Sequence, residues 1–193
     1  MTYKKLIWIP IIVGGIIVGF YLSRKKEFIK NPSFEEADPV SPEEPRYWYR
    51  NFEDATHVLT WDDTVSHSGN KSLRMDVLNS TKEWFAWDYY LDEISDLNPI
   101  EQGDYILEFW VKGESIASGS AVPYVHFHEY DANGNESIIK DVEFNMEGTF
   151  DWTKLTYLWT PESNTAYLRI GLDFYGTNGI VWYDDVSLNK IDI

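Results

Sequence analysis

The stretch Leu168–Leu188, with the sequence LRIGLDFYGTNGIVWYDDVSL, decides the fold class of this chain. Apolar residues occupy every second position from Leu168 to Phe174, and polar residues or glycine lie between them. A period of two is typical of a strand in an antiparallel sheet that packs one face on a core. The tetrapeptide Gly176-Thr177-Asn178-Gly179 then supplies the residues of a turn. This stretch therefore predicts a β-strand that ends in a tight turn.

The same alternation recurs along the chain. It is present in KSLRMDV at 71–77, in YILEFWV at 105–111, and at 125–128, where valine and phenylalanine alternate with two histidines. A turn sequence follows at 131–135, and no stretch shows the 3.6-residue period of a long amphipathic helix. About eight such runs predict an all-β domain, a two-sheet antiparallel β-sandwich of the jelly-roll type.

Composition excludes several classes of function. The 193 residues include 32 acidic and 16 basic ones, for a formal net charge of -16. No nucleic acid is expected as a partner, because phosphate binding requires a clustered basic surface. The chain has no cysteine, which excludes disulfides, thiolate zinc sites, iron–sulfur clusters and cysteine nucleophiles. A glycine-rich phosphate loop and a nucleophile elbow are also missing from the sequence.

Charge divides the chain into two parts. Residues 1–30 hold six basic residues and one acidic residue, so the remaining 10 bases and 31 acids give residues 31–193 a net charge of -21. The basic part encloses LIWIPIIVGGIIVGFYL, the 17 uncharged residues from Leu6 to Leu22. As a helix this run would be about 26 Å long, close to the thickness of a bilayer core.

We therefore expect two domains. Residues 1–30 are predicted to be a signal anchor with one transmembrane helix at 6–22, and residues 31–193 the β-sandwich. A cleaved signal peptide and a buried helix of a water-soluble domain are the alternatives for the apolar run. Bases flank both ends of the run, so the positive-inside count is nearly equal. We expect a membrane-anchored protein whose sandwich lies outside the cell, because the composition of this part resembles that of a secreted binding domain.

Five local signatures occur in a characteristic order, and together they cover about 31–193. This order resembles the family 4/9-type carbohydrate-binding modules, which belong to the galactose-binding-like jelly-roll class. The signatures are Asn31-Pro-Ser-Phe-Glu35, His67–Leu73, Tyr105–Gly113, Asp151-Trp-Thr-Lys-Leu155 and Trp182–Leu188. The resemblance implies non-catalytic binding of a glycan or polysaccharide. The same sandwich also serves in adhesion and in structural modules, so the fold does not by itself define a ligand.

The resemblance also implies a structural calcium ion that ties the first strand to the last. By match to the family motif, its side-chain ligands are Glu35 and Asp185, and its main-chain carbonyl ligands come from the loop around Gly69 and Lys71. Carboxylate and carbonyl oxygens are the ligands that calcium prefers. The alternative is that Asp185 and its neighbour Asp184 cap or pair at a strand edge.

A ligand surface follows from the pattern of the strands. Strands near 83–91, 123–130 and 166–175 are expected to share one sheet, whose outward side is concave in this family. Aromatic rings there would stack on sugar rings, while polar groups would bind hydroxyls. Phe85, Trp87, Tyr89 and Leu91 are assigned inward, and a slip of one residue would exchange the two sets. The predicted outward, ligand-binding residues are Trp84, Asp88, Tyr90, Tyr124, His126, His128, Arg169, Asp173 and Tyr175.

Other functions for these residues remain open. His126 and His128 share one face and could bind zinc with Glu129 or Asp173, although Glu129 is expected on the opposite face. Asp88 and Asp173 could be the carboxylate pair of a glycosidase, but no motif supports this assignment. We do not expect an enzyme. The leading hypothesis is binding of a neutral glycan at the cell surface, and the alternative is a structural or adhesive surface protein that contacts a protein partner.

Overall fold

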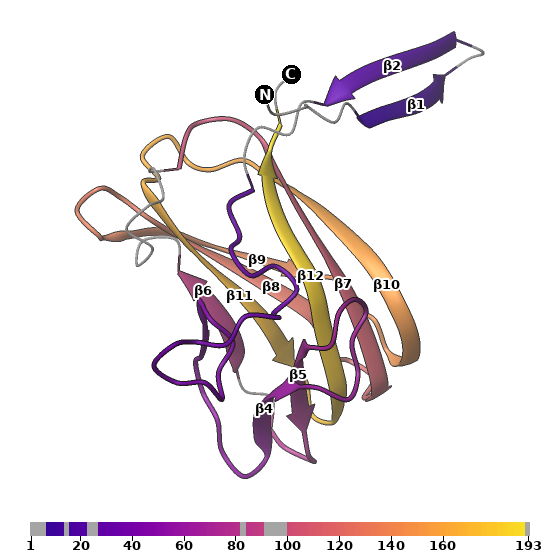
Figure 1. Cartoon of the computed structure of the whole chain (residues 1–193), viewed down its shortest axis with the longest axis vertical. Coiled ribbons are helices and arrows are strands. Elements are labelled where there is room, and N and C mark those ends of the chain that lie inside the picture. Colours follow the sequence, from indigo (N-terminus) through magenta and orange to yellow (C-terminus); the bar gives the residue numbers. More distant parts are fainter. Residues whose placement is uncertain (1–6, 14–15, 23–26, 82–83, 91–99, 192–193) are drawn as a thin grey trace.

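The computed structural model describes residues 7–13, 16–22, 27–81, 84–90 and 100–191 of the chain (Figure 1). In this part, ten strands form two five-stranded antiparallel sheets that pack as a sandwich. The β7 sheet has the order β10-β7-β12-β5-β4 and the β8 sheet the order β3-β6-β11-β8-β9. Strands of the β7 sheet are β4 (His57–Asp62), β5 (Ser72–Val77), β7 (Tyr105–Ile116), β10 (Gly148–Trp159) and β12 (Gly179–Lys190). Strands of the β8 sheet are β3 (Trp48–Arg50), β6 (Ala86–Tyr90), β8 (Ala121–Tyr130), β9 (Glu136–Glu143) and β11 (Tyr167–Tyr175).

The core lies between the two sheets, and the alternating residues of the sequence fill it. In β7, every second side chain from Tyr105 to Val111 is fully buried, and in β11 the same holds from Leu168 to Phe174. The predicted all-β, two-sheet antiparallel sandwich is therefore confirmed. Aromatic side chains supply much of the core volume, because the largest fully buried residues are three tryptophans, four tyrosines and five phenylalanines.

The order of the strands brings distant segments of the sequence together. The runs near 83–91, 123–130 and 166–175 contain β6, β8 and β11, which are neighbours in the β8 sheet, as predicted. Figure 1 shows this sheet as the layer behind β12, β7 and β10. Turn residues end the strands as expected: the Asp131 carboxylate accepts hydrogen bonds from the main chain of Asn133 and Asn135, which closes the turn between β8 and β9.

The sandwich begins before residue 31. Glu27 pairs with Asn189 in an isolated β-bridge, and its carboxylate accepts a hydrogen bond from the main chain of Leu188. Phe28 and Ile29 are 3% and 2% exposed and belong to the core. These residues, which the charge pattern groups with the basic segment, thus pack against the last strand of the domain.

The apolar run near the N-terminus differs from the expected transmembrane helix. Ile7–Val13 (β1) and Ile16–Leu22 (β2) form a two-stranded antiparallel ribbon in which Ile7 pairs with Leu22. In the described part of the chain, no helix is long and apolar enough to cross a membrane. The physical reason is that β-branched isoleucine and valine favour strands, so an apolar run alone does not distinguish a strand from a helix.

Candidate functional site

The outward face of the β8 sheet carries the predicted ligand residues in rows that cross the strands. One row is formed by Tyr49, Asp88, Gly171, His126 and Asp141, each paired with the next. The neighbouring row contains Tyr90, Arg169, His128 and Ile139. Phe85, Trp87 and Tyr89 are fully buried in the core, as predicted, while Leu91 lies outside the described residues. The side chain of Tyr90 lies outside the described residues.

His126 is the centre of a buried polar cluster. Its Nδ1 lies 3.1 Å from Asp173 Oδ2 on β11, and its Nε2 lies 3.3 Å from Asp88 Oδ1 on β6. Burial opposes a charge on His126, but the hydrogen bonds and charges of both carboxylates outweigh it and raise the pKa of the imidazole to about 9. The charged form of His126 is therefore favoured between the two carboxyl groups, while burial raises the pKa of Asp173 in turn.

Gly171 makes this geometry possible. It lies between Asp88 and His126 in the row across the sheet, and the imidazole passes over it to reach the aspartate. A Cβ atom at position 171 would lie 1.9 Å from His126 Nε2, which is far inside van der Waals contact. A glycine inside a strand often marks such a close approach, and this signal could have identified position 171 from the sequence.

Arg169 and His128 extend the cluster. Arg169 Nη1 lies 3.7 Å from Asp88 Oδ2, and Nη2 lies 2.6 Å from His128 Nε2. Because a guanidinium group can only donate, His128 Nε2 must accept, and its Nδ1 must donate to Glu136. Burial lowers the pKa of His128, and the nearby Arg169 charge lowers it further. The cluster thus sets two basic side chains, His126 and Arg169, against two carboxyl groups, Asp88 and Asp173.

Aromatic side chains form one end of the face. The indole of Trp84 stacks on the Tyr175 ring at 4.3 Å between centroids, with 19° between the planes, and it also contacts Tyr124 at 4.6 Å. Trp84 is 53% exposed, whereas Tyr124 is 1% exposed. One broad aromatic surface is therefore held in place by two tyrosines and open to solvent.

A cavity of about 350 Å³ brings the polar cluster and the exposed indole together. Its volume lies near the lower end of the range for small-molecule sites. Five of the nine predicted ligand residues line the cavity. Asp88, Tyr124 and Tyr175 do not line it, but each contacts a residue that does. The lining residues are Asn51, Trp84, Phe85, His126, His128, Ile139, Asp141, Arg169 and Asp173.

Sequence reasoning missed Asn51, Ile139 and Asp141 among these lining residues. Ile139 and Asp141 lie on β9, and the turn sequence at 131–135 could have paired this run with β8 as a hairpin. Asn51 follows the three-residue strand β3, and its main-chain N–H donates to the carbonyl of Ala86. A segment this short gives no periodic signal, so only the tertiary structure places Asn51 at the cavity.

One expectation about exposure is corrected. Asp88, His126 and Asp173 lie on the outward face but are 1%, 7% and 1% exposed, so they form the floor of the site rather than an open surface. They are buried because their charges satisfy one another across three strands. A ligand would instead meet Trp84 and Ile139, which are 53% and 51% exposed, and the polar edges of the cluster.

The residues proposed for calcium gather at one loop, 66–71. Glu35 Oε1 accepts hydrogen bonds from the main chain of Asn70 and Lys71 at 2.8 and 2.9 Å. Asp185 pairs with the side chains of His67 and Ser68 at 2.6 and 2.7 Å. The loop therefore links an early segment of the domain with its last strand.

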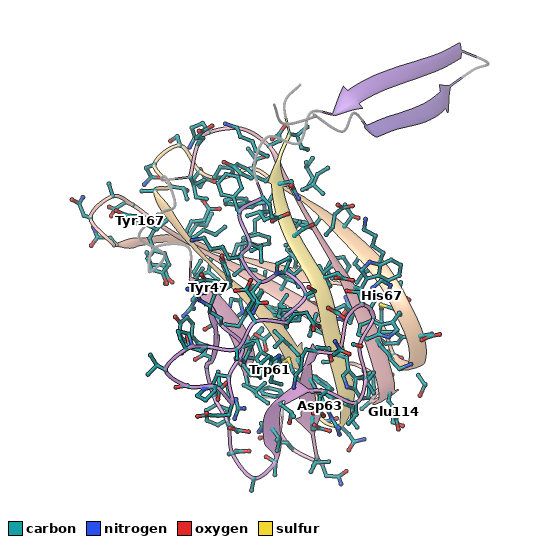
Figure 2. The ribbon with its side chains drawn as sticks, viewed as in Figure 1. Tyr47, Trp61, Asp63, His67, Glu114 and Tyr167 are labelled. Carbon is teal, nitrogen blue, oxygen red and sulfur yellow. The ribbon has the colours of Figure 1, made fainter. Side chains whose placement is uncertain are left out.

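Several features of this loop affect how well it suits a bound cation. The loop contains His67, which Figure 2 labels. Its ring stacks on Trp110 of β7 at 3.8 Å between centroids. Burial raises the pKa of the neighbouring Asp184 to about 6, and the charge of Asp185 contributes to this rise. The donor set of carboxylates and carbonyls suits calcium chemically, but the loop turns N–H groups, not carbonyls, toward Glu35.

The zinc alternative finds no matching geometry. Glu129 is 1% exposed and accepts hydrogen bonds from Trp159 Nε1, the main chain of Glu162 and the Thr165 hydroxyl, so it is directed away from the two histidines. Both ring nitrogens of His126 already contact carboxylates. Among the side chains that the structure describes, no group of three His, Cys, Asp or Glu residues could hold a metal ion.

Comparison with known proteins identifies the fold. No family model and no curated protein sequence matches this chain. Among solved structures, it is similar to the CBM22-1 xylan-binding domain of Paenibacillus barcinonensis Xyn10C, with a TM-score of 0.55, 16% identity, and coverage of 83% of this chain and 92% of that domain. A family 4 carbohydrate-binding module gives a TM-score of 0.51 at 15% identity, over 84% of this chain and 99% of the module.

A catalytic protein carries the same fold. The enzymatically active domain of bacteriophage CBA120 tailspike protein 4 gives a TM-score of 0.62 at 11% identity over 86% of this chain, which spans only 21% of that protein. At such identities the similarity concerns the fold alone. The fold of this chain thus resembles non-catalytic carbohydrate-binding modules, and it also occurs within larger enzymes.

Proposed function

We propose that this protein is a non-catalytic carbohydrate-binding protein, and that the cavity on the β8 sheet binds a neutral glycan or polysaccharide. The observation that carries the proposal is the exposed indole of Trp84 beside a buried, charge-paired polar cluster. An aromatic face stacks on the C–H face of a pyranose ring, and fixed polar groups then take its hydroxyls.

Preorganisation supports this proposal. Trp84 is stacked on Tyr175, so its ring needs little ordering when a sugar arrives. The polar groups are fixed as well, because His126 is held from both sides by carboxylates and Arg169 contacts both Asp88 and His128. Such a site recognises a ligand by its shape and hydroxyl pattern without a large conformational change.

The charge balance favours a neutral ligand. The two basic side chains of the cluster are each paired with carboxyl groups of Asp88 or Asp173, and Asp141 adds a further carboxyl group to the lining. The domain as a whole is strongly acidic, since residues 31–193 carry a net charge of -21. Long-range repulsion would therefore oppose anionic polymers, while neutral glycans would not be affected.

The same cluster argues against a glycosidase. Hydrolysis of a glycoside needs two carboxyl groups that are free to act as acid and as base or nucleophile. Asp88 and Asp173 both contact His126 and are both 1% exposed, so their oxygens are engaged within the protein. This arrangement therefore supports ligand binding without covalent chemistry.

We also propose that residues 6–22 attach the protein to a membrane and that the sandwich lies outside the cell. The support is in the sequence, where 17 uncharged residues are flanked by basic ones. Calcium is proposed as a structural ion at the loop 66–71, with Glu35, Asp185 and carbonyls of Gly69 and Lys71 as its ligands. A cation there would relieve the mutual repulsion of Asp184 and Asp185.

Substitution of the aromatic surface tests the carbohydrate proposal. Binding of the full chain to xylan, soluble β-glucans and galactans is measured by affinity electrophoresis for the wild type, Trp84→Ala and Tyr175→Ala. We expect binding to at least one polysaccharide and a loss of about tenfold or more in each variant. Trp152→Ala, which removes a tryptophan from β10 of the other sheet, is the matched control and should bind normally.

Two results would overturn the proposal. One is wild-type binding that Trp84→Ala leaves unchanged while its melting temperature is also unchanged. The other is a folded wild type that binds none of the polysaccharides but self-associates, which would favour the structural or adhesive alternative. Exposed apolar residues on the edge strands β9 and β10, namely Ile139 and Leu158, are the surface from which such association would start.

A further inference from the structure

A second cavity lies at the opposite edge of the β8 sheet. It has a volume of about 330 Å³ and is formed by the edge strand β3 and the loop that precedes it. Tyr47, which comes directly before this strand, marks its position in Figure 2. None of its lining residues lines the first cavity. The lining residues are Asp38, Ser41, Glu44, Pro45, Trp48, Tyr49 and Arg50.

Trp48 gives this cavity an unsatisfied donor. The residue is 1% exposed, and its ring is fixed by contacts with Phe34 and Tyr89, both at 5.1 Å between centroids. Its indole N–H is buried and has no hydrogen-bond partner among the described residues. A buried donor without a partner lowers stability, so an oxygen of a ligand that accepts this hydrogen bond would recover that loss.

Glu44 gives this cavity a hydrogen-bond acceptor. Its Oε2 is buried and lies 3.2 Å from Arg50 Nε in an ion pair. Burial raises the pKa of Glu44, although the Arg50 charge opposes the rise. The carboxylate can therefore accept a hydrogen bond from a ligand. A hydroxyl group can both accept from an indole and donate to a carboxylate.

Rings complete the lining. Tyr49 is 44% exposed on the outward face, where it pairs with Asp88, and Pro45 adds a second apolar surface. With Asp38, Glu44 and Arg50 the lining has two carboxylates against one guanidinium, which disfavours an anionic ligand. The volume is close to the lower limit for small-molecule sites, so the cavity accommodates a small unit and not a long chain segment.

We propose that this cavity is a second carbohydrate site, which binds one neutral sugar unit through the Trp48 indole N–H, the Glu44 carboxylate and the Tyr49 ring. It uses no residue of the first cavity, so it goes beyond the function proposed for that site. Two sites on one sandwich would bind a branched or multivalent glycan more tightly than either site alone, because the second contact becomes intramolecular.

The test follows the indole N–H of Trp48 directly. The ¹⁵N-labelled full chain in detergent contains nine tryptophans, and the Trp48 indole signal is assigned by its absence in Trp48→Phe. D-galactose, D-xylose and D-glucose are titrated separately. We expect at least one sugar to shift the Trp48 signal in a saturable manner in the wild type.

Variants separate this site from the first one. Tyr49→Ala should weaken the sugar affinity about two- to tenfold, and Glu44→Gln about tenfold. Trp84→Ala, which disrupts the first cavity, should leave the Trp48 shift unchanged. If only the proposal for the first site is wrong, Trp84→Ala will have no effect on polysaccharide binding. The Trp48 signal will still shift when the sugar is added.

Two outcomes would contradict the second site. The first is that none of the three sugars shifts the Trp48 signal in a saturable manner. The second is a shift that disappears in Trp84→Ala but persists in Tyr49→Ala and Glu44→Gln, since the sugar would then occupy only the first cavity. Only variants that keep the melting temperature of the wild type are compared. Glu44→Gln preserves the size of the side chain, so it still tests the site if Tyr49→Ala perturbs the loop.

Discussion

The imidazole of His126 lies directly over the main chain of Gly171, so that any side chain at position 171 would collide with it. A Cβ atom there would be 1.9 Å from Nε2. Through this gap the histidine of β8 crosses β11 and reaches Asp88 on β6 at 3.3 Å. The polar floor of the candidate site thus depends on a residue that contributes no functional group.

Gly171→Ala should therefore dismantle the cluster. We expect the free energy of unfolding to fall by about 1–3 kcal/mol, as for overpacking of a buried site, and glycan binding to decrease with it. Chemical denaturation and affinity electrophoresis measure the two effects. In a double-mutant cycle, His126→Ala should relieve part of the cost, because it removes the ring that the new methyl group meets. Strict additivity of the two substitutions would show that the ring and position 171 do not interact.

Stability should depend on pH through His126. The pKa of His126 is about 9 in the folded protein, whereas its ordinary value is 6.5. Protonation of the imidazole therefore stabilises the folded state. This contribution is complete below pH 6.5, declines as the pH rises, and is lost above pH 9; its upper limit is about 3 kcal/mol. Denaturant unfolding across this range should show the loss in the wild type. An equal loss in His126→Gln would assign the pH dependence to another group.

Calcium should stabilise the protein if the loop 66–71 holds it. We expect a chelator to lower the melting temperature and added calcium to restore it, because an ion that binds only the folded state stabilises that state. Glu35→Gln should abolish the response. The matched control is Glu36→Gln, whose carboxylate is 61% exposed and paired with Arg46 at the surface. A melting temperature that is insensitive to both chelator and calcium would rule out the ion.

Membrane attachment should depend on the apolar run. In the full chain, Ile12→Glu combined with Val18→Glu places two charges in the segment, at a cost of about 5 kcal/mol for insertion. We expect the wild type to stay in the membrane pellet after an alkaline wash and the double variant to be released. Val40→Glu with Leu158→Glu adds the same charges at exposed positions of the sandwich and should remain in the pellet. Release of the wild type would exclude an integral anchor.

The strand pattern was predictable because it is a local property. The period of two in Leu168–Phe174 and Tyr105–Val111 identifies which side chains face the core, and burial in the structure agrees with it. The same period placed Trp87 inward and Asp88 on the outward face of β6. For the apolar run at 6–22 the local pattern was ambiguous, since isoleucine and valine suit either a strand or a membrane helix.

The sequence by itself therefore determined the all-β class, the inward and outward faces, and the candidate aromatic and charged residues. Only the tertiary structure decided that Asp88, His126 and Asp173 pair with one another and become buried, because they come from three strands far apart in the chain. It also decided that Asn51 and Asp141 join the cavity and that Trp48 keeps an unpaired N–H beside Glu44. Periodicity fixes the direction of a side chain, whereas its partners depend on which strands become neighbours, and that order is not written in any local pattern.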